Sequence, residues 1–262
     1  MTLNDDKNRG KAMMHDIDGS NGSILELKDV TKSFGGIHAL QGININIQKG
    51  AIVGLIGPNG AGKTTLFNMI SGFLGMDRGE IRFNQKEISR LYPYDRSRLG
   101  IGRTFQLPKI FNNMSVLDNV LIGALQKSSD VNESKQVAME ILRDINMDTI
   151  ADSFPGDLPI ASRKKLEICR ALASSPTLLL LDEAISGLTP KETLEMIDLI
   201  EKLSAKGITL LIIEHVMKFI MNISQWIVVL NYGQKIAEGT PEEIARNETV
   251  IDAYLGKKEL SC

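Results

Sequence analysis

The stretch GPNGAGKTT, residues 57–65, combines three glycines with a lysine and two threonines. It follows a continuous apolar run and precedes the helical pattern LFNMISGF, which is the context that a phosphate-binding loop requires. Glycines permit a tight turn in which backbone N–H groups converge on phosphate oxygens, and the following helix N-terminus favours an anion. We expect Lys63 to reach the β- and γ-phosphates of a nucleotide and the Thr64 hydroxyl to bind Mg²⁺. The predicted nucleotide-binding residues here are Gly57, Pro58, Asn59, Gly60, Ala61, Gly62, Lys63, Thr64 and Thr65.

Two adjacent carboxylates follow a second apolar run, TLLLLD at 177–182. Asp182 is suited to hold Mg²⁺, directly or through water. Glu183, the next residue, is suited to polarise an attacking water as a general base. Acid pairs at strand ends are also common as solvated turn residues, so the assignment depends on the phosphate loop upstream. Together the two motifs predict a site that binds and hydrolyses ATP.

Two further polar residues stand at the ends of apparent strands. His215 follows a third apolar run in LLIIEH, so we expect it at the carboxyl edge of the sheet, placed to contact a γ-phosphate. A histidine after a strand is often a surface or capping residue, and only its place in this series favours the functional role. Gln106, in IGRTFQ, is a candidate to contact metal or water, and the sequence leaves a plain surface position equally open.

The overall composition limits the classes of partner. The chain has 262 residues and is 43% hydrophobic, enough for one large domain with a buried core. Lysine and arginine total 30 against 32 acidic residues, a formal charge of −2. We therefore expect no nucleic-acid partner, because nucleic-acid binders are usually basic. The two cysteines, Cys169 and Cys262, form neither a disulfide framework nor a metal-ligand spacing.

The ends of the chain and its longest apolar stretch bear on membrane association. Residues 1–23 are polar and charged, so we expect a flexible extension rather than a signal peptide. Polar residues interrupt the longest uncharged run, 219–234, and we expect no membrane span. Any role at a membrane must therefore come through a partner.

Two kinds of strand are predicted to position these residues. Ile43, Ile45 and Ile47 alternate with polar residues, the pattern of an antiparallel strand with one solvated face. The runs 51–57, 177–182 and 209–214 are instead continuously apolar, as in a parallel sheet covered by helices on both faces. The sequence therefore predicts an α/β fold.

Helix signals complete the predicted organisation. Thr189 and Thr240 each precede a proline and stand three residues before a glutamate, which is the capping-box pattern of a helix start. Ser115 is a candidate N-cap for VLDNVLIGAL, and NESKQVAMEILRDI is a second amphipathic run. We predict a helical lobe, at about residues 107–165, inserted into the α/β core.

Taken in order, GPNGAGKT, the glutamine of RTFQ, LLLLDE and LLIIEH resemble the motifs of ABC transporter ATP-binding subunits. The resemblance covers about residues 24–256, with a short C-terminal tail at 257–262. It implies a P-loop NTPase fold of the ABC ATPase type: a mostly parallel core sheet flanked by helices, an antiparallel β lobe and an inserted helical lobe. It also implies an ATPase that dimerises head to tail, with each ATP between the phosphate loop of one subunit and the signature loop of the other.

The resemblance assigns roles to four residues. Phe34, in TKSFGG, is the aromatic that stacks on adenine, although an ordinary strand-end aromatic is the plain alternative. Gln106 is the glutamine that senses metal and water, Glu183 is the base, and His215 is the switch histidine. The implied metal ligands are therefore Thr64, Gln106 and Asp182, and the implied cofactors are ATP and Mg²⁺.

One motif departs from the family pattern. Where the signature usually reads LSGGQ or a variant that keeps a glycine, this chain has Leu158, Pro159, Ile160, Ala161 and Ser162. Pro159 supplies neither a hydroxyl nor a donor N–H at the place of the serine. Ala184 also replaces the usual proline, and Thr189 replaces an aspartate or asparagine. Because the remaining motifs are intact, we expect a heterodimer with a related ATPase whose signature is complete.

A narrower resemblance is to the ATPases of branched-chain amino-acid importers of the LivG type. It rests on GIGRTFQ with NNMSVLDNV, KKLEICRAL, GLTPKET, IIEHVMKFIMNIS and GTPEEIARNETVIDAYLG. It implies integral membrane permease subunits, an extracytoplasmic solute-binding protein and a place at the cytoplasmic face of the membrane. The candidate surface for the membrane subunits, with helical-lobe core as the equal alternative, consists of Leu107, Ile110, Phe111 and Met114.

Two other functions compete with an importer subunit. A soluble ABC-type ATPase acting on nucleic acid or the ribosome generally carries two cassettes or a long coiled coil, and this sequence has one cassette without heptads. A degenerate regulatory cassette with little hydrolysis is suggested by the altered signature, but Lys63, Asp182, Glu183 and His215 count against it.

Overall fold

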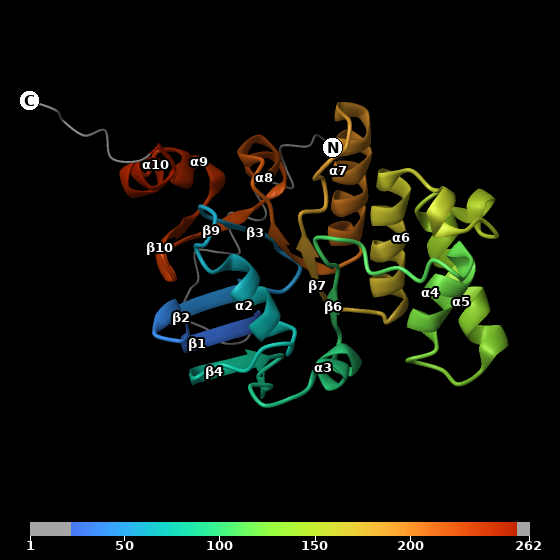
Figure 1. The fold of residues 1–262 in the computed structure, drawn as a ribbon, viewed down its shortest axis with the longest axis horizontal. Coiled ribbons are helices and arrows are strands. Elements are labelled where there is room, and N and C mark those ends of the chain that lie inside the picture. The colour runs from blue at the N-terminus through green and yellow to red at the C-terminus, as the bar shows by residue number, and fades with distance from the viewer. Residues whose placement is uncertain (1–21, 256–262) are drawn as a thin grey trace, which may run out of the picture. The chain divides into compact units, whose positions relative to one another are not determined.

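The computed structural model describes residues 22–255, and the chain divides into two compact units (Figure 1). The first unit holds the chain up to Tyr92 and from Thr209 onward, and the second holds Pro93–Ile208. Nearly all of the expected N-terminal extension and the whole C-terminal tail, 257–262, lie outside the described residues.

The first unit contains an antiparallel sheet in the order β2-β1-β4-β5. Its strands are β1 (Ser23–Phe34), β2 (Ile37–Gln48), β4 (Arg78–Phe83) and β5 (Lys86–Glu87). In β2 the three alternating isoleucines are buried while the asparagines between them are exposed. This confirms the predicted strand with one solvated face.

The same unit contains the parallel strands that lead into the phosphate loop. β3 (Ile52–Ile56) pairs in parallel with β8 (Thr209–Ile213) on one side and β9 (Trp226–Asn231) on the other. β10 (Gln234–Gly239) adds an antiparallel edge to β9. All residues of β3 and β8 are buried, as their continuous apolar sequences predict. The helices of this unit are α2 (Lys63–Ile70), α8 (Met217–Ile223), α9 (Pro241–Ala245) and α10 (Glu248–Leu255).

The second unit combines a parallel strand pair with helices. β6 (Ile101–Arg103) pairs in parallel with β7 (Leu178–Asp182). The helices are α3 (Pro93–Leu99), α4 (Val116–Ala124), α5 (Val131–Asp144), α6 (Ile160–Ala173) and α7 (Pro190–Ala205), with 3-10 turns at Asp148–Ile150 and Pro155–Asp157.

Helices α4, α5 and α6 pack against one another in this unit (Figure 1). Gly123 of α4 permits the close approach of α6, because a Cβ there would lie 2.5 Å from the carbonyl oxygen of Arg170. Helices α4 and α5 lie within the range of about 107–165 predicted for a helical lobe, and α6 begins within it and ends at Ala173.

Three predicted helix starts are confirmed. Thr189 and Thr240 form complete capping boxes with Glu192 and Glu243 at the starts of α7 and α9. Ser115 accepts a hydrogen bond from the N–H of Asp118 at the start of α4. Such caps satisfy backbone N–H groups that have no partner within the helix.

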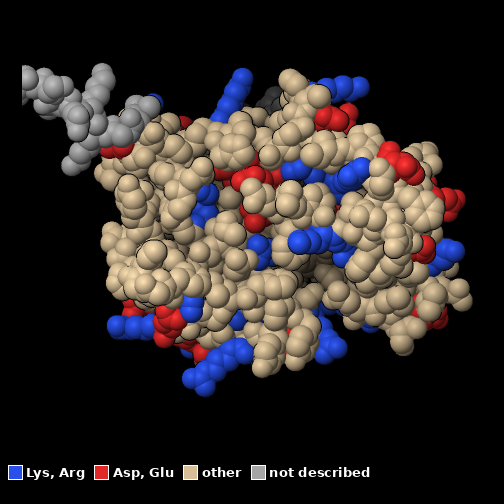
Figure 2. Space-filling model, in the orientation of Figure 1, with Lys and Arg blue, Asp and Glu red and all other residues tan. Residues whose placement is uncertain are grey.

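The surface carries mixed charge. Lysine, arginine and acidic side chains are interspersed on the face drawn in Figure 2, in keeping with the near-zero net charge of the chain. Within residues 22–255, no helix has the length and apolar character needed to cross a membrane.

Candidate active site

The phosphate loop connects β3 to α2 in the first unit and is held by backbone packing. Gly57 has φ 151°, and a Cβ there would lie 2.1 Å from the carbonyl oxygen of Leu230 on β9. Gly62 has φ 103°, and a Cβ there would lie 2.6 Å from the carbonyl oxygen of Ala39 on β2. Any larger residue would strain the backbone and collide with a neighbouring strand. The glycine spacing of the motif therefore reflects close contact with both sheets of this unit.

The lysine of the motif lies over the loop. Lys63 Nζ donates hydrogen bonds to the carbonyl oxygens of Gly57 and Pro58, at 2.6 and 2.9 Å. Thr64 is exposed on the first turn of α2. A cation beside the N-terminus of a helix, with a glycine-rich backbone around it, provides donors and positive charge for phosphate oxygens.

Tyr254 of α10 also contacts the loop, which the motif analysis did not foresee. Burial raises the pKa of its hydroxyl, and a hydrogen bond with the Gly57 backbone opposes that shift. Its sequence signal is weak, because a single tyrosine in an amphipathic helix is usually a packing residue.

His215 lies where the sequence predicts, beyond the carboxyl end of β8. Leu55 of β3 pairs with Ile213 of β8, so the phosphate loop and His215 leave the parallel strands at the same edge. The His215 ring is 56% exposed, and its Nδ1 lies 3.9 Å from a carboxylate oxygen of the fully buried Glu214. The imidazole is therefore accessible to a ligand and has an acceptor beside it.

Phe34 ends β1 with its ring 47% exposed. The ammonium group of Lys32 lies 5.5 Å from the ring centroid. An exposed ring face of this kind is available for stacking, so the adenine-stacking role stays a prediction with a suitable geometry.

The second unit brings Gln106 and Glu183 together. β6 and β7 are parallel, and the segments that follow them emerge at one edge. Gln106 Nε2 donates to a carboxylate oxygen of Glu183 at 3.1 Å. The sequence left Gln106 open between a functional and a surface role, and this contact favours the functional one. The role of Gln106 as a ligand of metal or water stays a prediction.

Asp182 is almost fully buried at the end of β7. Its carboxylate lies 3.5 Å from the guanidinium of Arg103, and both side chains are less than a tenth exposed. Burial lowers the pKa of Arg103, whereas the negative charge of Asp182 opposes that change. The Asp182 N–H donates to the Thr104 hydroxyl at 3.2 Å. The guanidinium contact restricts the carboxylate, and the Thr104 contact restricts the Asp182 backbone.

The three residues predicted to bind Mg²⁺ each carry an oxygen donor, and their joint role stays a prediction. Asp182 offers a carboxylate oxygen, Thr64 a hydroxyl and Gln106 an amide oxygen, which are the ligand types that Mg²⁺ prefers. Asp182 is the last residue of β7, Gln106 lies three residues after the end of β6, and Thr64 is the second residue of α2.

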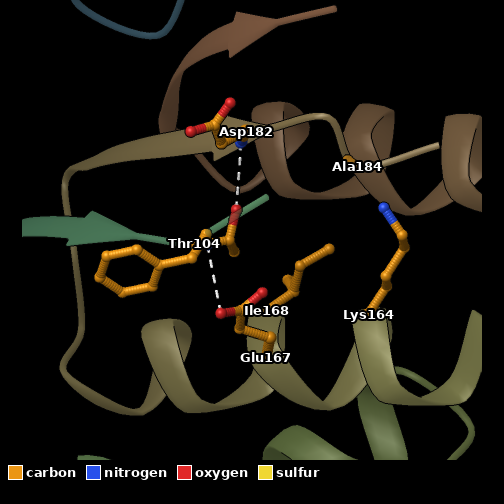
Figure 3. A pocket seen from close by; sticks show the side chains of 7 residues that line it. Thr104, Lys164, Glu167, Ile168, Asp182 and Ala184 are labelled. Carbon is orange, nitrogen blue, oxygen red and sulfur yellow. Dashed lines mark hydrogen bonds between the residues drawn. The ribbon is translucent and has the colours of Figure 1, made fainter. Parts of the chain in front are cut away.

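A buried acid that the motif analysis did not single out borders this region. Glu167 of α6 is 5% exposed. Its carboxylate accepts a hydrogen bond from the N–H group of Phe105 at 3.2 Å (Figure 3), and a second from the N–H group of Lys109 at 3.1 Å. Burial raises its pKa to about 7, against the opposing effects of these bonds and of the charges on Arg170 and Lys164. The sequence signal was an acid within the apolar stripe of KKLEICRAL.

Comparison with known proteins identifies the family. Residues 40–186 match the family model described as ABC transporter. The chain belongs to the ABC transporter ATP-binding subunits. Residues 234–259 match a second model, described as branched-chain amino acid ATP-binding cassette transporter.

Individual relatives cover nearly the whole chain. The branched-chain amino acid transport ATP-binding protein BraF of Pseudomonas aeruginosa is 40% identical, with 89% of this chain and 98% of that protein aligned. A probable LivG of Archaeoglobus fulgidus is 36% identical over 91% of this chain and 98% of that protein. A crystal structure of a nucleotide-free cassette from an ABC transporter has a TM-score of 0.82 at 34% identity, covering 90% of this chain and 100% of that one. The predicted ABC ATPase fold is thereby confirmed.

In this ABC subunit the signature segment lies at the start of α6. Pro159 is the N-cap of the helix and no side chain caps it. Leu158 and Ala161 are buried, whereas the Ile160 side chain is 49% exposed. Arg163 donates from Nε to the carbonyl oxygen of Leu158 at 2.9 Å. An apolar side chain therefore projects where the family signature offers small or polar groups.

The segment after Gln106 presents apolar side chains to solvent. Leu107 is 76% exposed and Phe111 is 45% exposed, and the Arg170 guanidinium lies 4.7 Å from the Phe111 ring centroid. Ile110 and Met114 are half-buried. Two of the four residues are therefore exposed and two are half-buried, and their role as a surface for the membrane subunits stays a prediction.

Proposed function

We propose that this chain hydrolyses ATP to power import of branched-chain amino acids, as a subunit at the cytoplasmic face of the membrane. The family supports the ATPase activity, and the hydrogen bond between Gln106 and Glu183 is the observation that supports working hydrolytic chemistry. The match of residues 234–259 to the branched-chain model and the names of the relatives BraF and LivG support the solute class.

The chemistry assigned to each residue follows from its type and position. Lys63 and the loop amides bind the phosphates, and Phe34 stacks on the adenine ring. Glu183 accepts a proton from the attacking water, while the Gln106 amide orients that carboxylate and the water. His215 contacts the γ-phosphate. Mg²⁺ supplies neutralisation of phosphate charge, with Asp182, Thr64 and Gln106 as its proposed ligands.

The proposed partners follow from the family and from the exposed surface. ATP-binding subunits of importers work with membrane permease components, and the exposed Leu107 and Phe111 are proposed to contact them. A second ATPase subunit and an extracytoplasmic solute-binding protein complete the proposed assembly. The absence of a nucleic-acid partner is proposed from the net charge of −2.

Replacement of the base tests this function. In the transporter complex that co-purifies with the tagged chain, reconstituted in liposomes, Glu183→Gln should bind ATP but reduce ATP turnover by about 100-fold or more. ATP-dependent uptake of radiolabelled leucine should fall in parallel. The exposed surface change Glu201→Gln on α7 serves as a control of matched chemistry. Unchanged turnover in Glu183→Gln would exclude the assigned base, and ATP turnover without uptake of leucine, isoleucine or valine would exclude the assigned solute.

A further inference from the structure

Helix α6 buries two charged side chains on one face. Lys164 is 6% exposed and Glu167 is 5% exposed, and they are three residues apart. Residues at this spacing lie on the same side of a helix. Burying charged groups is costly unless they are paired and hydrogen-bonded. Their partners therefore indicate why the sequence retains charge at these positions.

Glu167 holds the segment that carries Gln106. One carboxylate oxygen accepts from the N–H groups of Phe105 and Lys109, so it binds the backbone on both sides of Gln106. Figure 3 shows the carboxylate pointing from α6 toward this segment, with Thr104 beside it. Two hydrogen bonds to one buried oxygen restrict the path of the intervening loop.

Lys164 holds the segment that carries Glu183. Its ammonium group donates a hydrogen bond to the backbone carbonyl of Glu183, and in Figure 3 it points toward Ala184. Glu183 has φ 51°, a left-handed conformation that a residue with a side chain adopts at a cost in free energy. A cation on the carbonyl oxygen stabilises that peptide orientation, and the orientation in turn directs the Glu183 side chain toward Gln106.

We propose that Lys164 and Glu167 are positioning residues for ATP hydrolysis, which bind the backbones of Glu183 and the Gln106 segment to one rigid helix. The inference rests on the proposed roles of Glu183 and Gln106. Because α6 begins at the signature segment, with Ile160 one turn before Lys164, a displacement of the helix start moves both catalytic segments together. When the signature segment contacts the ATP of a second subunit, the resulting displacement of α6 therefore moves the Gln106 and Glu183 segments of this subunit.

The test separates positioning from general stability. Glu167→Leu removes the acceptor of both hydrogen bonds, and Lys164→Met removes the contact with Glu183 while keeping an unbranched apolar stem. In the assembled transporter each variant should lower kcat for ATP by about 10- to 100-fold, the usual range for groups that orient catalytic ligands. KM for ATP should stay unchanged, because the phosphate loop is untouched. Amide exchange at Phe105 and Lys109 should accelerate in Glu167→Leu alone.

Matched variants make the result decisive. Glu167→Gln keeps an acceptor oxygen and should have a kcat close to that of the wild type. Lys165→Met, also on α6, removes a surface ion pair with Glu195 of α7 and should leave kcat unchanged. Should Glu167→Leu fail to fold, Lys164→Met carries the test alone. A folded variant with wild-type kcat, or a rise in KM in place of a fall in kcat, would overturn the proposal. If Glu183→Gln itself left ATP turnover unchanged, the proposed function would be overturned instead.

Discussion

At the scale of single residues, the decisive contacts lie between side chains and backbone. Lys63 donates hydrogen bonds to two carbonyl oxygens of its own loop, and Lys164 donates to the carbonyl oxygen of Glu183. Glu167 accepts hydrogen bonds from two backbone N–H groups. Such contacts cannot be identified from residue type, because every residue except proline offers the same backbone groups. The phosphate loop and Glu183 could be predicted because their chemistry resides in the side chains and in the glycine spacing.

Lys63→Ala should remove the cation that phosphates require. We expect ATP affinity to fall by at least about 100-fold, since hydrogen bonds to charged groups contribute about 1.5–3 kcal/mol each. The Tm should stay close to that of the wild type, because Lys63 is only half-buried. Titration calorimetry on the isolated chain measures the affinity, with the exposed Lys86→Ala as the control of equal charge change. Wild-type affinity in Lys63→Ala would refute the phosphate-loop assignment.

Glu167 should make stability depend on pH. Its folded pKa of about 7 lies above the ordinary 4.5, so its stabilising contribution is present below about pH 4.5 and is lost as pH rises through about 7. Relative to Glu167→Gln, the wild type should lose up to about 3 kcal/mol of unfolding free energy between pH 4.5 and pH 8. Urea unfolding of both proteins across this range provides the measurement.

The exposed Glu195 serves as a control, because its contribution to stability depends on pH with the opposite sign. The hydrogen bond from Lys165 lowers the pKa of Glu195, so its contribution is present above about pH 4.5 and is lost as pH falls. Above about pH 4.5, Glu195→Gln should therefore be less stable than the wild type. A pH-independent difference between the wild type and Glu167→Gln would show that Glu167 does not titrate in this range.

At the scale of elements, the sequence predicted strands and helix starts better than their lateral contacts. Alternation and capping boxes are local patterns, and β2, α7 and α9 follow them. Gln106 was left open because β6 has only three residues and its pairing with β7 is nonlocal. The role of α6 also escaped the sequence, since its apolar stripe contains charged residues whose partners are 19 to 62 positions away. Packing, not periodicity, decides such contacts.

At the scale of the whole molecule, the fold could be predicted from the sequence, whereas the effect of the altered signature depends on a second subunit. The motifs and their order predicted the ABC ATPase fold, which the comparisons with known proteins confirm. The altered signature could be read from sequence, and the structure adds that the exposed Ile160 lies at the start of α6. What this segment does depends on a second ATPase subunit, so its consequence belongs to the assembly and requires a test on the assembly.

The altered signature predicts two unequal ATP sites in a heterodimer. Pro159 cannot donate a hydrogen bond from its backbone, and losing one bond to a charged group weakens closure or rate by about 10- to 150-fold. Ala161, Ser162 and the helix N-terminus still offer amides to an anion. The site completed by this segment should therefore mostly hold ATP. The other site, formed by this chain's phosphate loop and the partner's complete signature, should perform most of the hydrolysis.

Base replacements in the two subunits distinguish these sites. When both ATPases are co-expressed with the membrane pair, Glu183→Gln in this chain should nearly abolish ATP turnover, because its base serves the site with the complete signature. The equivalent change in the partner should reduce turnover far less, since its base serves the weakened site. Pro159→Ser, which restores the signature hydroxyl and N–H, should raise the turnover that survives Glu183→Gln. Equal loss from the two base changes, or a fully active homodimer of this chain, would show that the sites are equivalent.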